Sequence, residues 1–177
     1  PGHGEAHARM GELARGRGDD QSALVHSLQA LRTDDRAETL LAAADAYRQT
    51  GRPGDAIALF QDIIARDPGH VTALRALRDL AVAEGRWADA LPAQERLMSA
   101  VAPDERTSEQ TSLAGIHYER GRARMAEGDL TGGTAAFRDA LRVRPDFVPA
   151  ALALGDAHMQ AGDPTQALRV WERAVEA

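Results

Sequence analysis

The feature that most constrains the fold of this chain is an internal recurrence with an offset of 34 residues, clearest between Leu113 and Ala177. The first copy carries Arg120, Gly121, Arg124, Gly128, Gly133, Phe137 and Ala140, and the corresponding residues of the second are Leu154, Gly155, His158, Gly162, Ala167, Trp171 and Ala174. A period of this length, with small residues at fixed positions, is typical of arrays of helix–turn–helix units. The sequence therefore predicts an all-α repeat fold.

Alignment of the whole chain to this period gives about five repeats, hence about ten helices, in a single domain spanning 1–177. The repeats cover approximately 4–35, 37–70, 71–104, 114–147 and 148–177. One helical pair buries only one of its sides, so neighbouring repeats must stack and form a continuous core. Small residues such as Gly11, Ala44 and Gly155 recur where paired helices would cross, and a larger side chain there would cost about 1–3 kcal/mol through overpacking.

Nine extra polar residues, 105–113, separate the third repeat from the fourth. The run Thr107-Ser108-Glu109-Gln110 fits a capping box, with Thr107 as the N-cap and Gln110 reaching back to it. We therefore expect the insertion to lengthen the following helix, which would run from roughly Ser108 to Glu127, and not to form a loose loop.

Composition excludes several classes of function. The formal net charge of −6 argues against nucleic acid as a partner, since its phosphates require a clustered basic surface. All 21 basic residues are arginine and there is no cysteine, so the chain has no P-loop lysine, Schiff-base lysine, thiol nucleophile or disulfide. No run approaches the ~20 apolar residues that span a bilayer. The sequence predicts a non-catalytic protein without a cofactor.

His3 and His7 are the pair of residues with the spacing of two metal ligands on one helical face. The segment between them matches neither zinc-protease pattern, and it lies at the start of the chain, where helices fray. We expect no metal site. Since the chain begins with Pro1 and not with methionine, we expect it to be a processed or excised piece.

These repeats resemble tetratricopeptide repeats over essentially the whole chain, and this resemblance implies a right-handed superhelix, an α-solenoid. A narrower resemblance is to lipopolysaccharide assembly protein B, a bacterial envelope regulator. It rests on Glu5-Ala6-His7 with Gly11-Glu12-Leu13 and Arg17-Gly18, on Gly85-Arg86-Trp87 with Ala90, on Ile116-His117-Tyr118-Glu119, and on Gly155-Asp156 with Gly162-Asp163, Ala167 and Trp171. The resemblance to that family implies a cytoplasmic array anchored at the inner membrane, with a cysteine-based metal module at its C-terminus. We expect both the anchor and the metal module to lie outside this chain. The resemblance implies an adaptor.

In tetratricopeptide arrays the first helix of each repeat lines a concave groove, and the resemblance implies which residues face it. They are Leu41, Asp45, Arg48, Arg75, Tyr118, Arg122, Met125, Leu152, Asp156 and Met159. Such a mixture can hold a peptide or partner protein, because methionine adapts its shape and tyrosine anchors. The alternative is a solvated polar face without a ligand.

Two further surfaces have alternative interpretations. One is an arginine cluster that either forms salt bridges, to Glu119, Glu127 and Asp139, or docks an acidic partner or lipid headgroup. Its members are Arg120, Arg122, Arg124, Arg138, Arg142 and Arg144. The other is the end of the last helix, where Leu168, Trp171 and Val175 have no polar capping helix after them. This end would either pack on another copy, making a homo-oligomer, or be covered by residues outside this chain.

Overall fold

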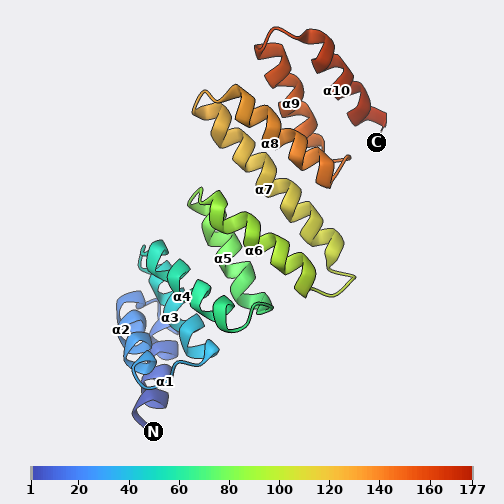
Figure 1. The fold of residues 1–177 in the computed structure, drawn as a ribbon. Helices are drawn as coiled ribbons and strands as arrows, with labels where there is room; N and C mark the ends of the chain where they lie inside the picture. The colour runs from blue at the N-terminus through green and yellow to red at the C-terminus, as the bar shows by residue number, and fades with distance from the viewer. Residues whose placement is uncertain (1, 177) are drawn as a thin grey trace. The chain divides into compact units, whose positions relative to one another are not determined.

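The computed structural model describes residues 2–176, and these form ten α-helices and no strand (Figure 1). Pro1 and Ala177, where the predicted domain begins and ends, lie outside the described residues. In chain order the helices are α1 (Gly2–Gly16), α2 (Asp20–Leu31), α3 (Ala37–Gln49), α4 (Pro53–Arg66), α5 (Val71–Ala83), α6 (Trp87–Ala100), α7 (Arg106–Ala126), α8 (Leu130–Val143), α9 (Val148–Gln160) and α10 (Pro164–Glu176). The all-helical repeat fold is confirmed.

The turn inside each of the five repeats has the same backbone conformation. A glycine with positive φ stands two residues after the end of α1, α3, α5, α7 and α9, at Gly18, Gly51, Gly85, Gly128 and Gly162. This left-handed conformation closes a helix at little cost only when the residue lacks a Cβ atom. The recurring glycine therefore ends the first helix of each repeat and turns the chain into the second.

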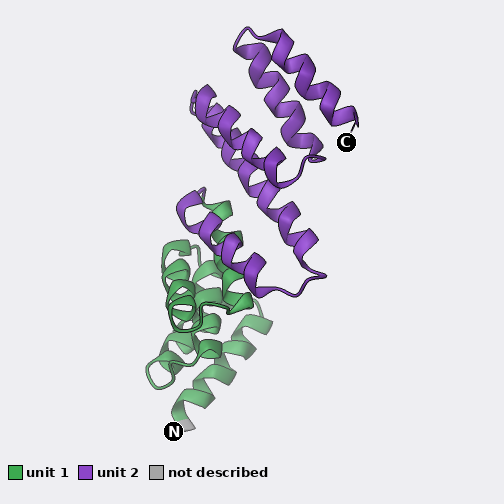
Figure 2. Cartoon of the chain, turned by 45° about the vertical axis from the view of Figure 1, so that its right-hand side comes forward, with its two compact units in different colours: residues 1–84 green, residues 85–177 purple. Residues whose placement is uncertain are grey.

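The chain divides into two compact units, residues 1–84 and 85–177, shown in separate colours in Figure 2. The boundary falls at the turn between α5 and α6, inside the third repeat. In the N-terminal unit each helix from α1 to α4 packs on the helix that follows it. Its core is built from large aliphatic and aromatic side chains, among them Ile57, Phe60, Ile63 and Leu74.

In the C-terminal unit each helix from α6 to α9 likewise packs on its successor, around a core that includes Leu97, Phe137 and Leu154. The paired helices of this unit cross closely because glycine, which has no Cβ atom, stands at the crossing points. A Cβ atom built on Gly121 would lie 2.5 Å from the Phe137 ring, and one built on Gly155 would lie 1.9 Å from Trp171 Nε1. The small residues at these positions thus leave room for the aromatic side chain of the paired helix.

The insertion lengthens α7 as expected, and this helix has 21 residues. The predicted capping box, however, is wrong. Glu105 is the N-cap and makes no side-chain capping hydrogen bond, while Thr107 lies inside the first turn. The helix starts earlier because the chain from Ala102 to Glu105 already forms a hydrogen-bonded turn that leads directly into it.

Candidate functional site

Three groove residues predicted in the N-terminal unit line one cavity of about 500 Å³ between α3 and α5. Asp45 and Arg48 come from α3 and Arg75 comes from α5, where Asp79 stands one turn further along. The Arg48 guanidinium lies 3.5 Å from the Asp45 carboxylate, and both side chains are about half exposed. Leu41 is half-buried one turn before Asp45 and does not line the cavity. The cavity therefore presents charges of both signs to an incoming segment.

The predicted groove residues of α7 are placed partly in packing contacts. The Tyr118 ring lies against Phe137 and Phe147, with centroids 5.9 and 6.0 Å away, and the Arg122 guanidinium lies over the ring, 5.9 Å from its centroid. Met125 is half-buried and packs over Gly133, since a Cβ atom on that glycine would lie 2.5 Å from its sulfur. Tyr118 and Met125 thus help to hold α7 on its neighbours.

The predicted groove residues of α9 are open to solvent. Leu152 and Met159 are 53% and 50% exposed, and Asp156 is exposed between them. They share one face of α9, since residues three and four apart are neighbours on a helix. Exposed large apolar side chains on one face are the kind of surface at which proteins meet.

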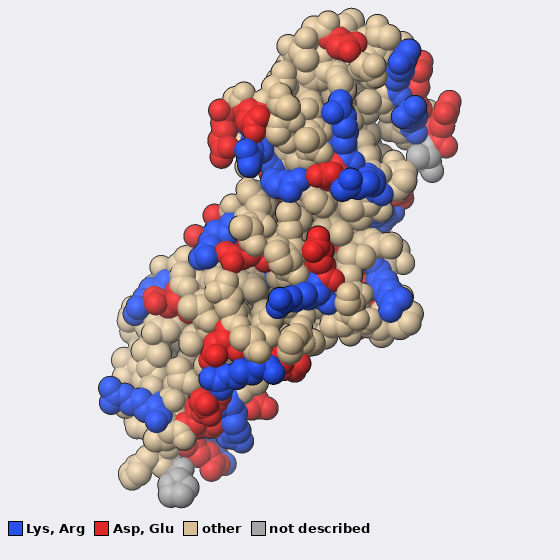
Figure 3. Space-filling view, in the orientation of Figure 1, with Lys and Arg blue, Asp and Glu red and all other residues tan. Residues whose placement is uncertain are grey.

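Ion pairs account for five of the six arginines of the predicted basic cluster. The carboxylates are Asp139, which pairs with both Arg120 and Arg142, and three further residues, Glu119, Asp129 and Asp146. Glu127, a predicted partner, is in none of these pairs. Figure 3 accordingly shows acidic and basic side chains next to one another on the face in view. This geometry favours the salt-bridge interpretation of the cluster, because its charges are largely neutralised.

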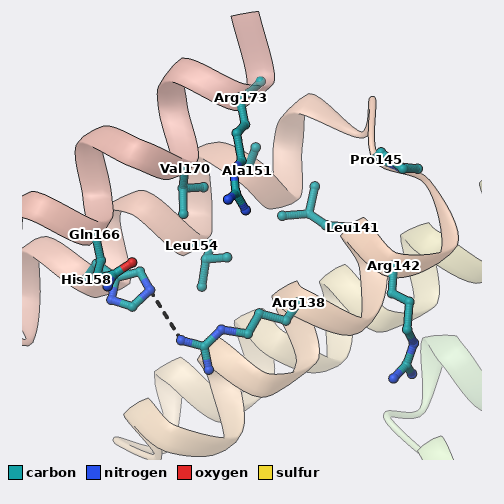
Figure 4. Close-up of a pocket in the computed structure, with 11 residues that line it drawn as sticks. Arg138, Leu141, Arg142, Pro145, Ala151, Leu154, His158, Gln166, Val170 and Arg173 are labelled. Carbon is teal, nitrogen blue, oxygen red and sulfur yellow. Dashed lines mark hydrogen bonds between the residues drawn. The ribbon is translucent and has the colours of Figure 1, made fainter. Parts of the chain in front are cut away.

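The sixth arginine, Arg138, lies in a different environment. It lines a pocket of about 450 Å³ between α8, α9 and α10, where its guanidinium is 3.4 Å from His158 Nε2 (Figure 4). Arg173 stands on α10 across the pocket from Arg138, with Val170 beside it, and the apolar side chain of Leu154 lies between the two arginines. Sequence reasoning missed this pocket because most of its lining residues lie on α8 and α10, the second helices of their repeats, whereas the predicted groove residues all lie on first helices. The arginine on α10 was the available signal, since α8 has Asp139 at the same repeat position.

Apolar side chains are also exposed at the end of the last repeat. Leu168 and Val175 are 55% and 88% exposed. Trp171 is half-buried, because its indole packs over Gly155 and points its Nε1 toward the Leu152 carbonyl oxygen, 3.5 Å away. Of the three residues predicted to lack a cover, two therefore face solvent and the tryptophan packs on α9.

His3 and His7 have the spacing of metal ligands, but in the structure His7 contacts a histidine of the next helix. His7 Nδ1 lies 3.2 Å from His26 Nδ1 of α2, and His3 is exposed. Within residues 2–176 there is no group of three or more histidine and acidic side chains that could hold a metal ion. Nor is any helix of the described chain both long and apolar enough to cross a membrane.

Stacked helix–turn–helix repeats with a turn glycine in each define the class of α-helical repeat scaffolds. Two stretches match family models described as tetratricopeptide repeat, residues 37–77 and 118–177, which together make up more than half of the chain. The chain belongs to the tetratricopeptide repeat proteins. The matched stretches span repeats in both compact units.

No curated protein matches the sequence. Solved structures of the protein MamA are similar in fold. One crystal structure has a TM-score of 0.63 at 22% identity, covering 98% of this chain and 91% of that chain. A second has a TM-score of 0.59 at 23% identity, with 94% and 93% covered. A third, "MamA 41-end from Desulfovibrio magneticus RS-1", has a TM-score of 0.59 at 18% identity, with 99% and 95% covered. At these identities the likeness shows the fold.

Proposed function

We propose that this protein is a non-catalytic adaptor that binds a peptide or partner-protein segment on the first helices of its repeats. The observation that carries the proposal is the cavity between α3 and α5. Asp45, Arg48 and Arg75 are among the groove residues that the resemblance to tetratricopeptide arrays implies, and all three line this one cavity. At about 500 Å³ it has the volume of ordinary ligand pockets.

Charge is the property through which this cavity would choose a partner. Its rim carries carboxylates and guanidiniums together, so it suits a segment with charges of both signs and not a uniformly acidic or basic one. The exposed face of α9, with Leu152 and Met159, would supply the apolar contacts of a second binding region in the C-terminal unit.

Quantitative affinity capture from the native cells tests the proposal. We expect Arg48→Glu to reduce the yield of captured partner, because it reverses a charge on the cavity rim. Arg32→Glu, an exposed position outside the cavity, is the control with the same change of charge and should leave the yield unchanged. Equal capture by the two variants, at equal thermal stability, would show that the cavity is not where the partner binds.

The exposed apolar end of the last repeat favours a second candidate function, a self-assembling module. Leu152, Leu168 and Val175 would be covered if this end packed on another copy of the chain. Sedimentation velocity over a concentration series should then show association, and Leu168→Glu with Val175→Glu should abolish it. A strict monomer at the highest concentration contradicts this candidate.

The location of the protein remains a prediction from the resemblance to the envelope regulators. It implies a cytoplasmic array held at the inner-membrane face by a segment outside this chain. Fractionation of the native cells, with detection by an antibody against these repeats, tests it. We expect the protein in the membrane fraction, from which a high-salt wash should not release it. Recovery wholly in the soluble fraction would contradict the predicted location.

A further inference from the structure

We propose that the pocket between α8, α9 and α10 is a second binding site, which takes an acidic peptide segment bearing an aliphatic side chain. This site is separate from the groove residues, none of which lines it. The proposal rests on three observations: the unneutralised charge of two arginines, the change from an acidic to a basic residue between α8 and α10, and the apolar floor of the pocket.

The charge of the pocket comes from Arg138 on α8 and Arg173 on α10. Within the described chain neither has a carboxylate partner, and the one side-chain contact of Arg138 is with His158. Both line the same pocket, so its walls carry two guanidiniums, although the net charge of the protein is −6. A guanidinium forms paired hydrogen bonds with a carboxylate, so the ligand group that the pocket selects is a carboxylate.

The residue at the repeat position of Arg173 differs between the repeats. It is Gln29 in α2, Asp62 in α4, Arg96 in α6 and Asp139 in α8. Asp62 forms an ion pair with Arg66 at 2.8 Å, and Asp139 neutralises Arg120 and Arg142. Between the last two repeats the carboxylate of α8 is thus replaced by a cation on α10, and this cation lines the pocket.

The floor between the two arginines is apolar. Leu154 is buried there, and Leu141 and Val170 are half-buried. A volume of about 450 Å³ accommodates an aliphatic side chain beside a carboxylate. Gln166 lines the same pocket, and its amide can donate to and accept from a main-chain peptide group. These features together fit a short acidic and aliphatic peptide.

The pocket and the predicted groove use different faces of α9. Ala151, Leu154 and His158 line the pocket, whereas Leu152, Asp156 and Met159 stand about a third of a turn further round the helix. The two sites can therefore be occupied, and mutated, independently. Failure of the groove proposal would not affect this one.

Titration of the full chain by heteronuclear NMR tests the proposal. The probe is the capped peptide acetyl-Leu-Glu-Leu-Glu-amide, added to ~1 mM, a range suited to weak sites. We expect shifts of the amide signals of Ala151, Leu154 and Val170. Arg138→Gln with Arg173→Gln should raise the dissociation constant roughly tenfold, because both charged partners of the carboxylate are removed. Arg169→Gln on the same helix, outside the pocket, is the matched control and should bind as the parent does.

Four results would overturn the proposal. The first is equal binding of the peptide with glutamine in place of glutamate, since the carboxylate would then be irrelevant. The second is unchanged binding by the double variant. The third is a shift pattern centred on Leu152 and Met159, which would place the peptide in the groove. The fourth is an equally strong response to sodium hexanoate alone, which would make the pocket a site for small aliphatic anions.

Discussion

Gln94 of α6 donates a hydrogen bond from its Nε2 to the main-chain carbonyl oxygen of Glu109 on α7, at 2.8 Å, and both residues are buried. The same amide contacts the Glu109 carboxylate at 3.0 Å. Glu109 lies in the insertion, so this pair attaches the extra turns of α7 to the helix before it. Replacement of Gln94 removes a buried donor from two acceptors.

We expect Gln94→Leu to lower the free energy of unfolding by about 1–3 kcal/mol, the usual cost of a buried polar group that loses its partner. Chemical denaturation measures it. Gln110→Leu, at the exposed neighbouring position, is the control and should change stability by less than about 0.5 kcal/mol. If the two variants unfold alike, the pair does not hold the insertion in place.

Gly155→Ala should destabilise the C-terminal unit by about 1–3 kcal/mol, because the new methyl group would lie 1.9 Å from Trp171 Nε1. The matched control is Gly115→Ala in α7, where a Cβ atom would meet nothing within 4 Å. That change should stabilise by roughly 0.5–1 kcal/mol, since alanine favours the helix. Thermal unfolding of both variants gives the comparison, and the same sign of effect at both positions would contradict the crossing geometry.

The pKa of His117 is lowered from its usual 6.5 by burial and, to a smaller extent, by the nearby charge of Arg120. The unfolded chain therefore binds a proton that the folded protein resists, and stability falls as the pH drops through 6.5 toward the folded-state pKa. His117→Gln should flatten this part of the profile of unfolding free energy against pH. A parallel profile for the variant and the parent would show that His117 is not the group responsible.

Asp34 joins the first repeat to the second. Its carboxylate accepts hydrogen bonds from the Arg36 main chain and side chain and from Thr39 Oγ1. These bonds, the Arg36 side chain first, hold the pKa of Asp34 well below its usual 3.8. Their stabilisation is present above pH 3.8 and is lost as the pH falls toward the folded-state pKa. Asp34→Asn should therefore be less stable than the parent at pH 7 and lose less on acidification. Circular dichroism melts from pH 7 to pH 2.5 measure both effects, and a variant as acid-sensitive as the parent would contradict the assignment.

The resemblance to tetratricopeptide arrays implies groove positions that include Asp45, Arg48 and Arg75, and these three residues line one cavity between α3 and α5. No such resemblance indicated the pocket between α8, α9 and α10. The pocket depends instead on Arg138 and Arg173 being left without carboxylates. An arginine is neutralised only if its side chain reaches a carboxylate, often one on another helix. The 34-residue period of the sequence does not specify these distances.

The start of α7 is a second feature that the sequence pattern did not predict correctly. The capping motif at Thr107 is a correct local pattern, yet the helix begins at Arg106 because the preceding turn already directs the chain into it. The burial of Gln94 against Glu109 was likewise invisible in the sequence, since both read as polar surface residues.

The sequence by itself determined the repeat, because its requirements are local. A left-handed turn needs a glycine such as Gly51, and a close crossing needs one such as Gly155, wherever the repeat stands in the chain. Tertiary structure alone decided which side chains are neutralised, buried or left open. Arg142 forms an ion pair with Asp139, whereas the Arg138 side chain contacts His158. Ion pairing depends on distances between side chains in space and not on their spacing along the chain.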